Sequence, residues 1–177
     1  APYFDSASAF HYANLAAMAE DPRGHYNVGR AFERGSGIDQ DLKKAFFHYD
    51  IAARHGIVMA QHNLGALYAN GTGVEQSYEQ AKLWYTIASV FKSYMSMRNL
   101  GLMNEEGQLD DKSRIRALAW YLLAHENGDG EVAEKIGQLQ HEFSPQQTES
   151  ELTTLKKELT DMEAKLRQEL PGWFESG

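Results

Sequence analysis

The chain of 177 residues is long enough to form one domain with a substantial hydrophobic core. Its formal charge of -8, with no basic cluster in the sequence, argues against nucleic acid or an anionic membrane as a partner. Because the sequence contains no cysteine, disulfides, thiolate metal sites and cysteine nucleophiles are excluded.

The sequence predicts no transmembrane segment, because no apolar run approaches the roughly 20 residues that a membrane-spanning helix needs. The chain starts at Ala1 and shows no charged-then-apolar leader, a start that either a removed signal peptide or a trimmed chain would leave. We therefore expect a periplasmic or secreted protein, and a cytoplasmic protein stays as the alternative.

The first predicted element is a helix over residues 6–20, and Asp21-Pro22 ends it because proline disfavours helical geometry at the residue before it. Residues 1–22 lie in register with the second helix of the repeated units described next. We interpret this segment as a capping helix. Its packing face is formed by residues at helical spacing, namely Phe10, Ala13, Ala16 and Ala17.

A motif then recurs with a period of 36 residues, which indicates a solenoid of stacked helical units. The copies close with Gly-Ser-Gly at 35–37, Gly-Thr-Gly at 71–73 and a degraded Gly-Gln-Leu at 107–109. Each copy predicts a first helix, a turn and a second helix, since glycine supplies the left-handed backbone that ends a helix. The predicted units cover residues 23–56, 57–92 and 93–128.

Small and large residues recur at matching positions of the units. Glycine inside a helix costs about 1 kcal/mol relative to alanine, so a glycine repeated in register indicates a place where a Cβ atom would clash. Aromatic residues on the second helix are expected to fill the space between layers. The small positions are Gly29, Gly65 and Gly101, with Ala45, Ala81, Ala117, Ala52, Ala88 and Ala124; the large ones are Tyr49, Tyr85 and Tyr121, preceded by His48, Trp84 and Trp120.

The remaining chain predicts a partial fourth unit over 129–143 and a C-terminal segment over 144–177. Gly137 lies in register with Gly101, so residues 128–143 are interpreted as a fourth first helix. Ser144-Pro145 predicts the start of a long helix that reaches about residue 169. Its stripe of leucines is interpreted either as a cap over the last repeat or as a homo-oligomer contact through 145–169.

The units resemble the Sel1-like repeat, a relative of the tetratricopeptide repeat. Residues 60–74 read Ala-x-x-Asn-Leu-Gly-x-x-Tyr-x-x-Gly-x-Gly-Val, and residues 81–88 read Ala-x-x-Trp-Tyr-x-x-Ala. The resemblance implies an all-α fold, a right-handed solenoid of antiparallel helix pairs with the first helices on the concave side. Members of this family usually act as adaptors that bind other proteins, often in the bacterial envelope or in signalling complexes.

The same resemblance indicates which positions of the first helices would line a groove for a partner protein or peptide. The lining changes from basic in the first unit, through neutral in the second, to acidic in the third, and such a gradient would orient a bound peptide. Ordinary solvated helix positions are the alternative interpretation. The groove positions are Arg23, Tyr26, Arg30, Arg34, Met59, His62, Ala66, Asn70, Arg98, Leu102 and Glu106.

Two further features have both a binding and a structural interpretation. The junction between the second and third units brings together Phe91, Tyr94, Met95 and Met97, which form either a second interface or ordinary packing. The asparagines of the first helices, Asn27, Asn63 and Asn99, either clamp a peptide backbone or hold neighbouring repeats in register, and we favour the second role.

No catalytic or cofactor motif is present, so we predict neither an enzyme nor a cofactor or metal site. The histidines have no metal-binding spacing, and His48 is expected to be an interior residue. Acidic residues 105, 106, 110 and 111 are interpreted as a solvated turn. We expect a protein-binding adaptor in the envelope of a Gram-negative bacterium, with a cytosolic regulatory adaptor or a structural oligomer as alternatives.

Overall fold

The computed structural model describes residues 5–109 and 113–174, and every element that it defines in these ranges is helical. The chain divides into two compact units, Ala1–Ala81 and Lys82–Gly177, with the division inside α5 (Tyr78–Val90).

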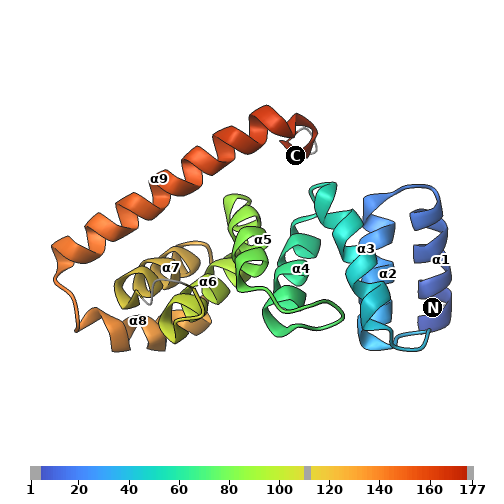
Figure 1. Cartoon of the computed structure of the whole chain (residues 1–177), viewed down its shortest axis with the longest axis horizontal. Coiled ribbons are helices and arrows are strands. Elements are labelled where there is room, and N and C mark those ends of the chain that lie inside the picture. The colour runs from blue at the N-terminus through green and yellow to red at the C-terminus, as the bar shows by residue number, and fades with distance from the viewer. Residues whose placement is uncertain (1–4, 110–112, 175–177) are drawn as a thin grey trace. The chain divides into compact units, whose positions relative to one another are not determined.

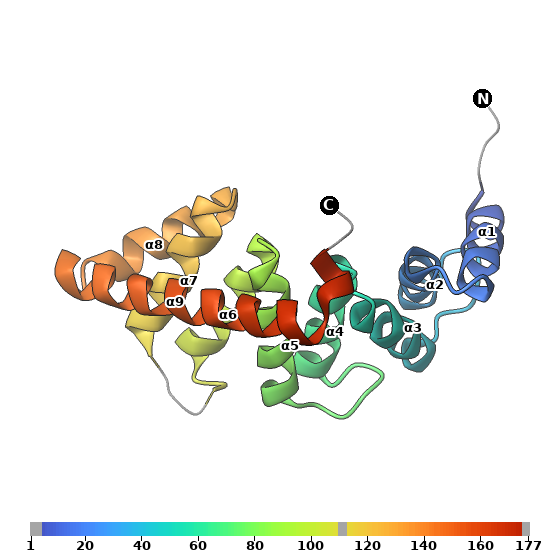
Figure 2. The ribbon, with the colours of Figure 1, turned by 90° about the horizontal axis from the view of Figure 1, so that it is seen from above.

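The N-terminal unit consists of α1 (Ser6–Met18), α2 (Pro22–Arg34), α3 (Leu42–Arg54), α4 (Val58–Asn70) and the start of α5. Helix α2 packs against α1 and α3, and α3 packs against α4 (Figures 1 and 2). At the start of α2 the Asp21 carboxylate accepts a hydrogen bond from the Arg23 amide. At its end Gly35 adopts the left-handed conformation with φ 66°, as the glycine turn predicts.

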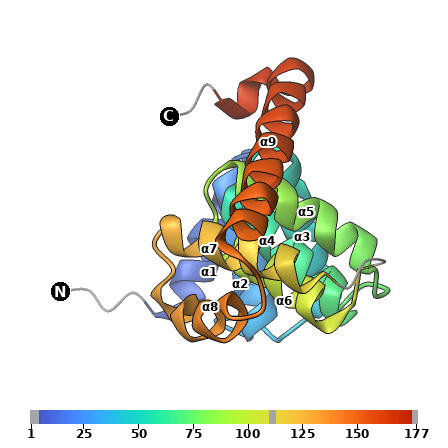
Figure 3. The same cartoon turned by 90° about the vertical axis from the view of Figure 1, so that its left-hand side faces the viewer.

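The C-terminal unit contains the rest of α5, α6 (Tyr94–Glu106), α7 (Arg114–Glu126), the 3-10 turn η1 (Gly130–Val132), α8 (Ala133–Gln140), α9 (Pro145–Glu169) and η2 (Pro171–Phe174). Helix α7 packs against α6, α8 and α9 (Figures 1 and 3). The predicted all-α fold of consecutive packed helix pairs is therefore confirmed.

The recurring small residues pack against the recurring tyrosines. A Cβ atom on Gly29 would lie 2.8 Å from a carbon of the Tyr49 ring, and one on Gly101 would lie 2.5 Å from the Tyr121 ring. The repeated alanines of α3, α5 and α7 are fully buried, and so are these tyrosines. The prediction of close helix packing at Gly29 and Gly101 is confirmed.

Each second helix ends in a residue with left-handed backbone, and all four lie in one column of the repeat. Gly56 (φ 81°) and Gly128 (φ 102°) adopt this conformation easily, whereas Glu20 (φ 59°) and Lys92 (φ 65°) carry a Cβ atom in the same region. A non-glycine residue there costs about 1–2 kcal/mol, because the Cβ atom approaches the following carbonyl oxygen.

Lys92→Gly should therefore raise the free energy of unfolding by about 1 kcal/mol. Glycine relieves the strained backbone of the folded state, and its greater conformational freedom in the unfolded chain offsets part of this gain. Urea titrations of the two proteins measure the change. Lys157→Gly, at an exposed position inside α9, is the control and should destabilise the protein by about 1 kcal/mol. A Lys92→Gly variant that is less stable than the wild type would show that the backbone at Lys92 is not strained.

The partial fourth unit differs from the prediction. Instead of one helix over 128–143, the chain forms η1 and then the short helix α8. Gly137, although in register with Gly101, is exposed, and a Cβ atom added to it would meet no heavy atom within 4 Å. The expectation of another close-packed first helix is wrong at this position, because no tyrosine ring of the described residues lies against Gly137.

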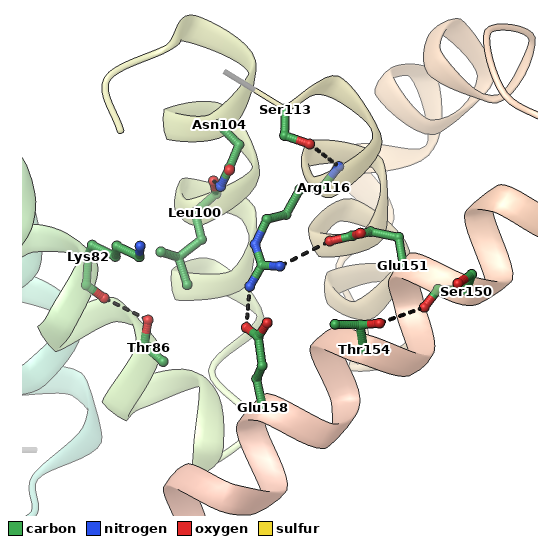
Figure 4. A network of polar contacts seen from close by, with 10 residues as sticks. All are labelled: Lys82, Thr86, Leu100, Asn104, Ser113, Arg116, Ser150, Glu151, Thr154 and Glu158. Carbon is green, nitrogen blue, oxygen red and sulfur yellow. Dashed lines mark hydrogen bonds and ion pairs between the residues drawn. The ribbon is translucent and has the colours of Figure 1, made fainter. Parts of the chain in front are cut away.

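Helix α9 begins as predicted, with a reciprocal capping box between Ser144 and Gln147. Its stripe of apolar residues faces its own chain: Leu152, Leu155 and Leu166 are buried, and Leu159 and Met162 are half-buried. In Figure 4 the Arg116 guanidinium of α7 lies between two carboxylates of α9, those of Glu151 and Glu158. Helix α9 thus packs on α7, as the capping interpretation expects.

Candidate protein-binding surface

The basic candidate residues of α2 lie on one exposed stripe of the N-terminal unit. Arg23 and Arg34 are exposed, whereas Tyr26 and Arg30 are half-buried, and the Arg30 guanidinium lies 5.6 Å from the centre of the Tyr26 ring. Within residues 5–109 and 113–174, none of the three arginines forms an ion pair. All five other arginines of the chain do: Arg54, Arg98, Arg114, Arg116 and Arg167.

This stripe borders a pocket of about 560 Å³ between α1 and α2. Helix α1 supplies an apolar wall that includes Phe10 and Ala13, and α2 supplies the three arginines together with Asn27. The Phe10 ring packs edge-on against Phe32, with ring centres 5.7 Å apart, and this contact fixes the apolar side of the pocket. The repeat motif predicts the position of these arginines but not the pocket beside them.

The candidate residues of α4 present a surface without acidic or basic side chains other than His62. Met59 and Asn70 are exposed, and His62 and Ala66 are half-buried. The opposite side of α4 is anchored in the core, because Leu64 and Gly65 are buried there. None of the four predicted positions is therefore lost to the core.

In α6 one of the two charged candidates, Arg98, is engaged inside the C-terminal unit. Arg98 forms an ion pair with Glu131, and its Nε lies 3.3 Å from an oxygen of the buried Asp129. Leu102 and Glu106 are exposed. The predicted acidic end of a groove is weaker than the sequence indicates, because the neighbouring Glu105 forms an ion pair with Lys135.

Glu105 accepts hydrogen bonds from Lys135, at 3.0 Å, and from the Tyr121 hydroxyl, at 2.9 Å. Burial alone would raise its pKa, but these two donors outweigh burial and hold the pKa of the Glu105 carboxyl below its ordinary value. Its negative charge is therefore stabilised by the chain itself and is less available to a partner.

The second candidate interface is contradicted in part. Met97 is only 1% exposed and belongs to the core, so it is not available to a partner. The side chain points inward because Met97 lies on the same face of α6 as the buried Leu100 and Gly101. Phe91 and Met95 are half-buried, with the Phe91 ring 6.3 Å from the Trp173 ring, and Tyr94 is exposed.

The asparagines of α4 and α6 hydrogen-bond to tyrosines of the preceding helix. Asn63 bonds to the Tyr49 hydroxyl, which itself donates to Glu33 at 2.7 Å, and Asn99 bonds to Tyr85. Burial raises the pKa of Tyr85 to about 12, so the phenol stays protonated at neutral pH. The structural role that we favoured for Asn63 and Asn99 agrees with these bonds, whereas Asn27 is exposed.

His48 takes the position that tryptophan has in the later units, and it packs against His25 of α2. The two Nδ1 atoms are 3.0 Å apart, and the His48 ring stacks on Phe32. Only one Nδ1 can donate to the other, so at least one imidazole is neutral. Burial, and secondarily the charge of His25, lower the pKa of His48 to about 4.

This pair should make the protein less stable in acid. An unfolded histidine titrates near pH 6.5, so between pH 6.5 and about 4 the unfolded state binds more protons than the folded state. The contribution of the neutral His48 to the free energy of unfolding is complete above pH 6.5 and is lost as the pH falls. The loss is on the order of 2 kcal/mol after allowance for solvent screening. Urea titrations at pH 7.5 and 4.5 measure the loss of unfolding free energy in acid. This loss should be smaller in His48→Trp than in the wild type, and equal losses in the two proteins would show that His48 is not its source.

None of the helices in the described ranges combines the length and the apolar character that crossing a bilayer requires. Among the described residues, no group of three or more histidine, aspartate or glutamate side chains is placed to hold a metal ion. Positions 110 and 111 of the acidic turn lie outside the described residues.

These helix pairs, their glycine turns and the tyrosine packing define an α-helical repeat protein. The family model of the Sel1 repeat matches residues 2–21, 22–57, 58–89 and 95–129. The chain belongs to the Sel1 repeat family.

Two solved structures are similar over most of the chain. One is a Sel1 repeat protein from Oxalobacter formigenes, with a TM-score of 0.74 and 25% identity, over 87% of this chain and 65% of that one. The other is a protective antigen of uropathogenic Escherichia coli strains with an SLR fold, with a TM-score of 0.72 and 26% identity, over 76% of this chain and 29% of that one. The chain thus spans less than two thirds of each neighbour. No curated protein matches it.

Proposed function

We propose that this protein is an adaptor that binds a partner protein through the exposed first-helix faces of its N-terminal unit, those of α2 and α4. Sel1 repeat proteins generally act as protein-interaction adaptors, and this class carries over to the chain. The observation that supports the location is the stripe of three arginines on α2 without an ion pair among the described residues. Such charges raise the rate and specificity of association with an acidic partner.

The charge of the rest of the chain strengthens this argument. With a net charge of -8, the protein as a whole repels an acidic partner, so attraction has to come from a local basic surface. The arginines of α2 provide one, because none of them is neutralised by a described carboxylate. The neutral residues of α4 add no charge that would repel an acidic partner.

A structural oligomer assembled through α9 is the alternative. It is less well supported, because the buried leucines of α9 already pack on α7 of the same chain. Light scattering on the purified full chain distinguishes the two: the adaptor proposal expects a monomer. A dimer that dissociates when the leucines of α9 are replaced would favour the oligomer.

The adaptor proposal is tested by partner capture from extracts of the cells that make the protein. Arg30→Glu/Arg34→Glu should abolish recovery of the partner seen with the wild-type chain, because the double substitution reverses the charge of the stripe. Lys43→Glu/Lys82→Glu, which changes the net charge by the same amount at exposed helical positions elsewhere, should not. Capture that is insensitive to the α2 substitutions would contradict this surface.

We also propose that the protein works in the bacterial envelope. The resemblance of the units to Sel1-like repeats, whose family members often work in the bacterial envelope, is the reason for this proposal. Fractionation of the source cells should recover the protein with periplasmic or extracellular markers. Recovery with cytosolic markers would leave the cytosolic regulatory adaptor as the better proposal.

A further inference from the structure

One column of the repeat is filled by a tyrosine in every complete unit but by alanine in the capping helix. Tyr49, Tyr85 and Tyr121 are all buried, and Ala13 of α1 occupies the position one period before Tyr49. In the N-terminal unit the Tyr49 ring lies against Gly29 of α2, and its hydroxyl reaches Asn63 of α4. Ala13 leaves α1 without the equivalent ring beside Asn27 of α2.

The pocket between α1 and α2 lies beside the position of the missing ring. Ala13 lines it from α1, and Asn27, the equivalent of Asn63, lines it from α2. Asn27 has no side-chain hydrogen bond within the described part of the chain, whereas Asn63 and Asn99 each bond to a tyrosine. The pocket therefore offers an apolar space and an unused amide that match a phenol ring.

The rim of the pocket is basic. Arg23, Arg30 and Arg34 all line it, at a spacing that places them on one side of α2. The acidic side chain in the lining is that of Asp21. Its carboxylate accepts a hydrogen bond from the Arg23 backbone amide at the start of α2. Three guanidinium groups therefore face one carboxylate, which leaves an excess of positive charge.

We propose that this pocket binds an acidic segment of the partner protein and takes up one tyrosine or phenylalanine side chain of that segment in place of the missing repeat tyrosine. The inference rests on the proposed adaptor function and names the chemistry of its partner. The aromatic ring lies against Ala13, a tyrosine hydroxyl meets Asn27, and flanking carboxylates pair with the arginines, for which planar carboxylates are the matching partner.

The probe for this proposal is a fluorescein-labelled peptide of eight residues in which glutamate and aspartate surround one central tyrosine. Fluorescence anisotropy of the full chain at low salt should give saturable binding. Replacing the tyrosine of the peptide by alanine, or raising the salt to 0.5 M, should each weaken binding roughly tenfold, through loss of the buried ring and through screening. A peptide with lysine in place of the acidic residues should not bind.

Two variants of the protein test the position. Ala13→Tyr restores the repeat pattern, fills the pocket from inside and should weaken the wild-type affinity at least about tenfold. Because its new ring can meet Asn27, its urea midpoint should equal or exceed that of the wild type, which shows that the loss of binding is not unfolding. Arg30→Glu/Arg34→Glu should abolish binding, and Lys43→Glu/Lys82→Glu should leave it within twofold.

The outcomes separate this inference from the adaptor proposal. If Ala13→Tyr leaves the peptide affinity unchanged, the ring does not enter the pocket and the inference is overturned. If the wild-type chain fails to bind the peptide while partner capture still depends on Arg30 and Arg34, the inference fails and the adaptor proposal stands. If neither the peptide nor partner capture responds to the arginines, both are wrong.

Discussion

Gly101→Ala should lower the free energy of unfolding by about 2–3 kcal/mol, and Gly137→Ala, one repeat later in the same column, should raise it by about 0.5–1 kcal/mol. The two substitutions are chemically identical and both lie inside helices of the C-terminal unit. Their opposite signs follow from what each new methyl group meets.

At Gly101 the methyl group would lie 2.5 Å from a carbon of the Tyr121 ring, and helix propensity recovers only part of the cost. The ring cannot move aside easily, because it is buried and its hydroxyl is held by Glu105. At Gly137 the methyl group would point into open space, so only the gain in helix propensity remains. Urea titrations followed by circular dichroism measure both changes.

Gly137→Ala serves as the control for Gly101→Ala, since it reports what the same substitution does without a neighbour. Equal effects at the two positions would show that the tyrosine packing does not require glycine. A double variant Gly101→Ala/Tyr121→Leu refines the test, because a smaller side chain at position 121 should recover part of the loss caused by the alanine.

The second large effect is expected from Leu155→Ala in α9, which should cost about 3 kcal/mol of unfolding free energy. Leu155 is 1% exposed, and α9 packs on α7. Removing the side chain leaves a cavity in this contact, and the ion pairs of Arg116 with Glu151 and Glu158 do not refill it (Figure 4). Thermal or urea unfolding gives the size of the loss.

Leu83→Ala is the matched control, because Leu83 lies in α5 and is 43% exposed. It should change the stability by less than about 1 kcal/mol. The loss for Leu155→Ala should be independent of protein concentration, since its contact is made within one chain. A loss that grows on dilution would indicate that α9 joins two chains instead.

The repeat register predicted most of the fold because it depends on local rules. The positions of Gly35, Gly71 and Gly107 predicted left-handed helix ends, and all three have positive φ. The start of α9 was predicted from Ser144-Pro145 for the same reason, since a helix cap is encoded within a few residues. The arginines of α2 were likewise found by counting positions from the repeat motif.

What the sequence did not predict depends on contacts between segments distant in sequence. Arg98 was expected to face a partner, but Asp129 and Glu131 engage it from a segment that departs from the repeat pattern. Met97 was predicted to belong either to a second interface or to ordinary packing, and its side of α6 is the buried one. The pocket beside Ala13 could have been inferred from its departure from the tyrosine column, once the role of that ring was known.

The central claim, that the first-helix face of the N-terminal unit binds a partner protein, is tested most directly by site-specific photo-crosslinking in the cells that make the protein. A benzoylphenylalanine at Ala66, on the proposed face of α4, should form a crosslink to one partner protein, and the crosslink should disappear with Arg30→Glu/Arg34→Glu. The same group at the exposed Lys43 of α3 should form none. Crosslinks of equal strength from both positions, or from Lys43 alone, would contradict the account.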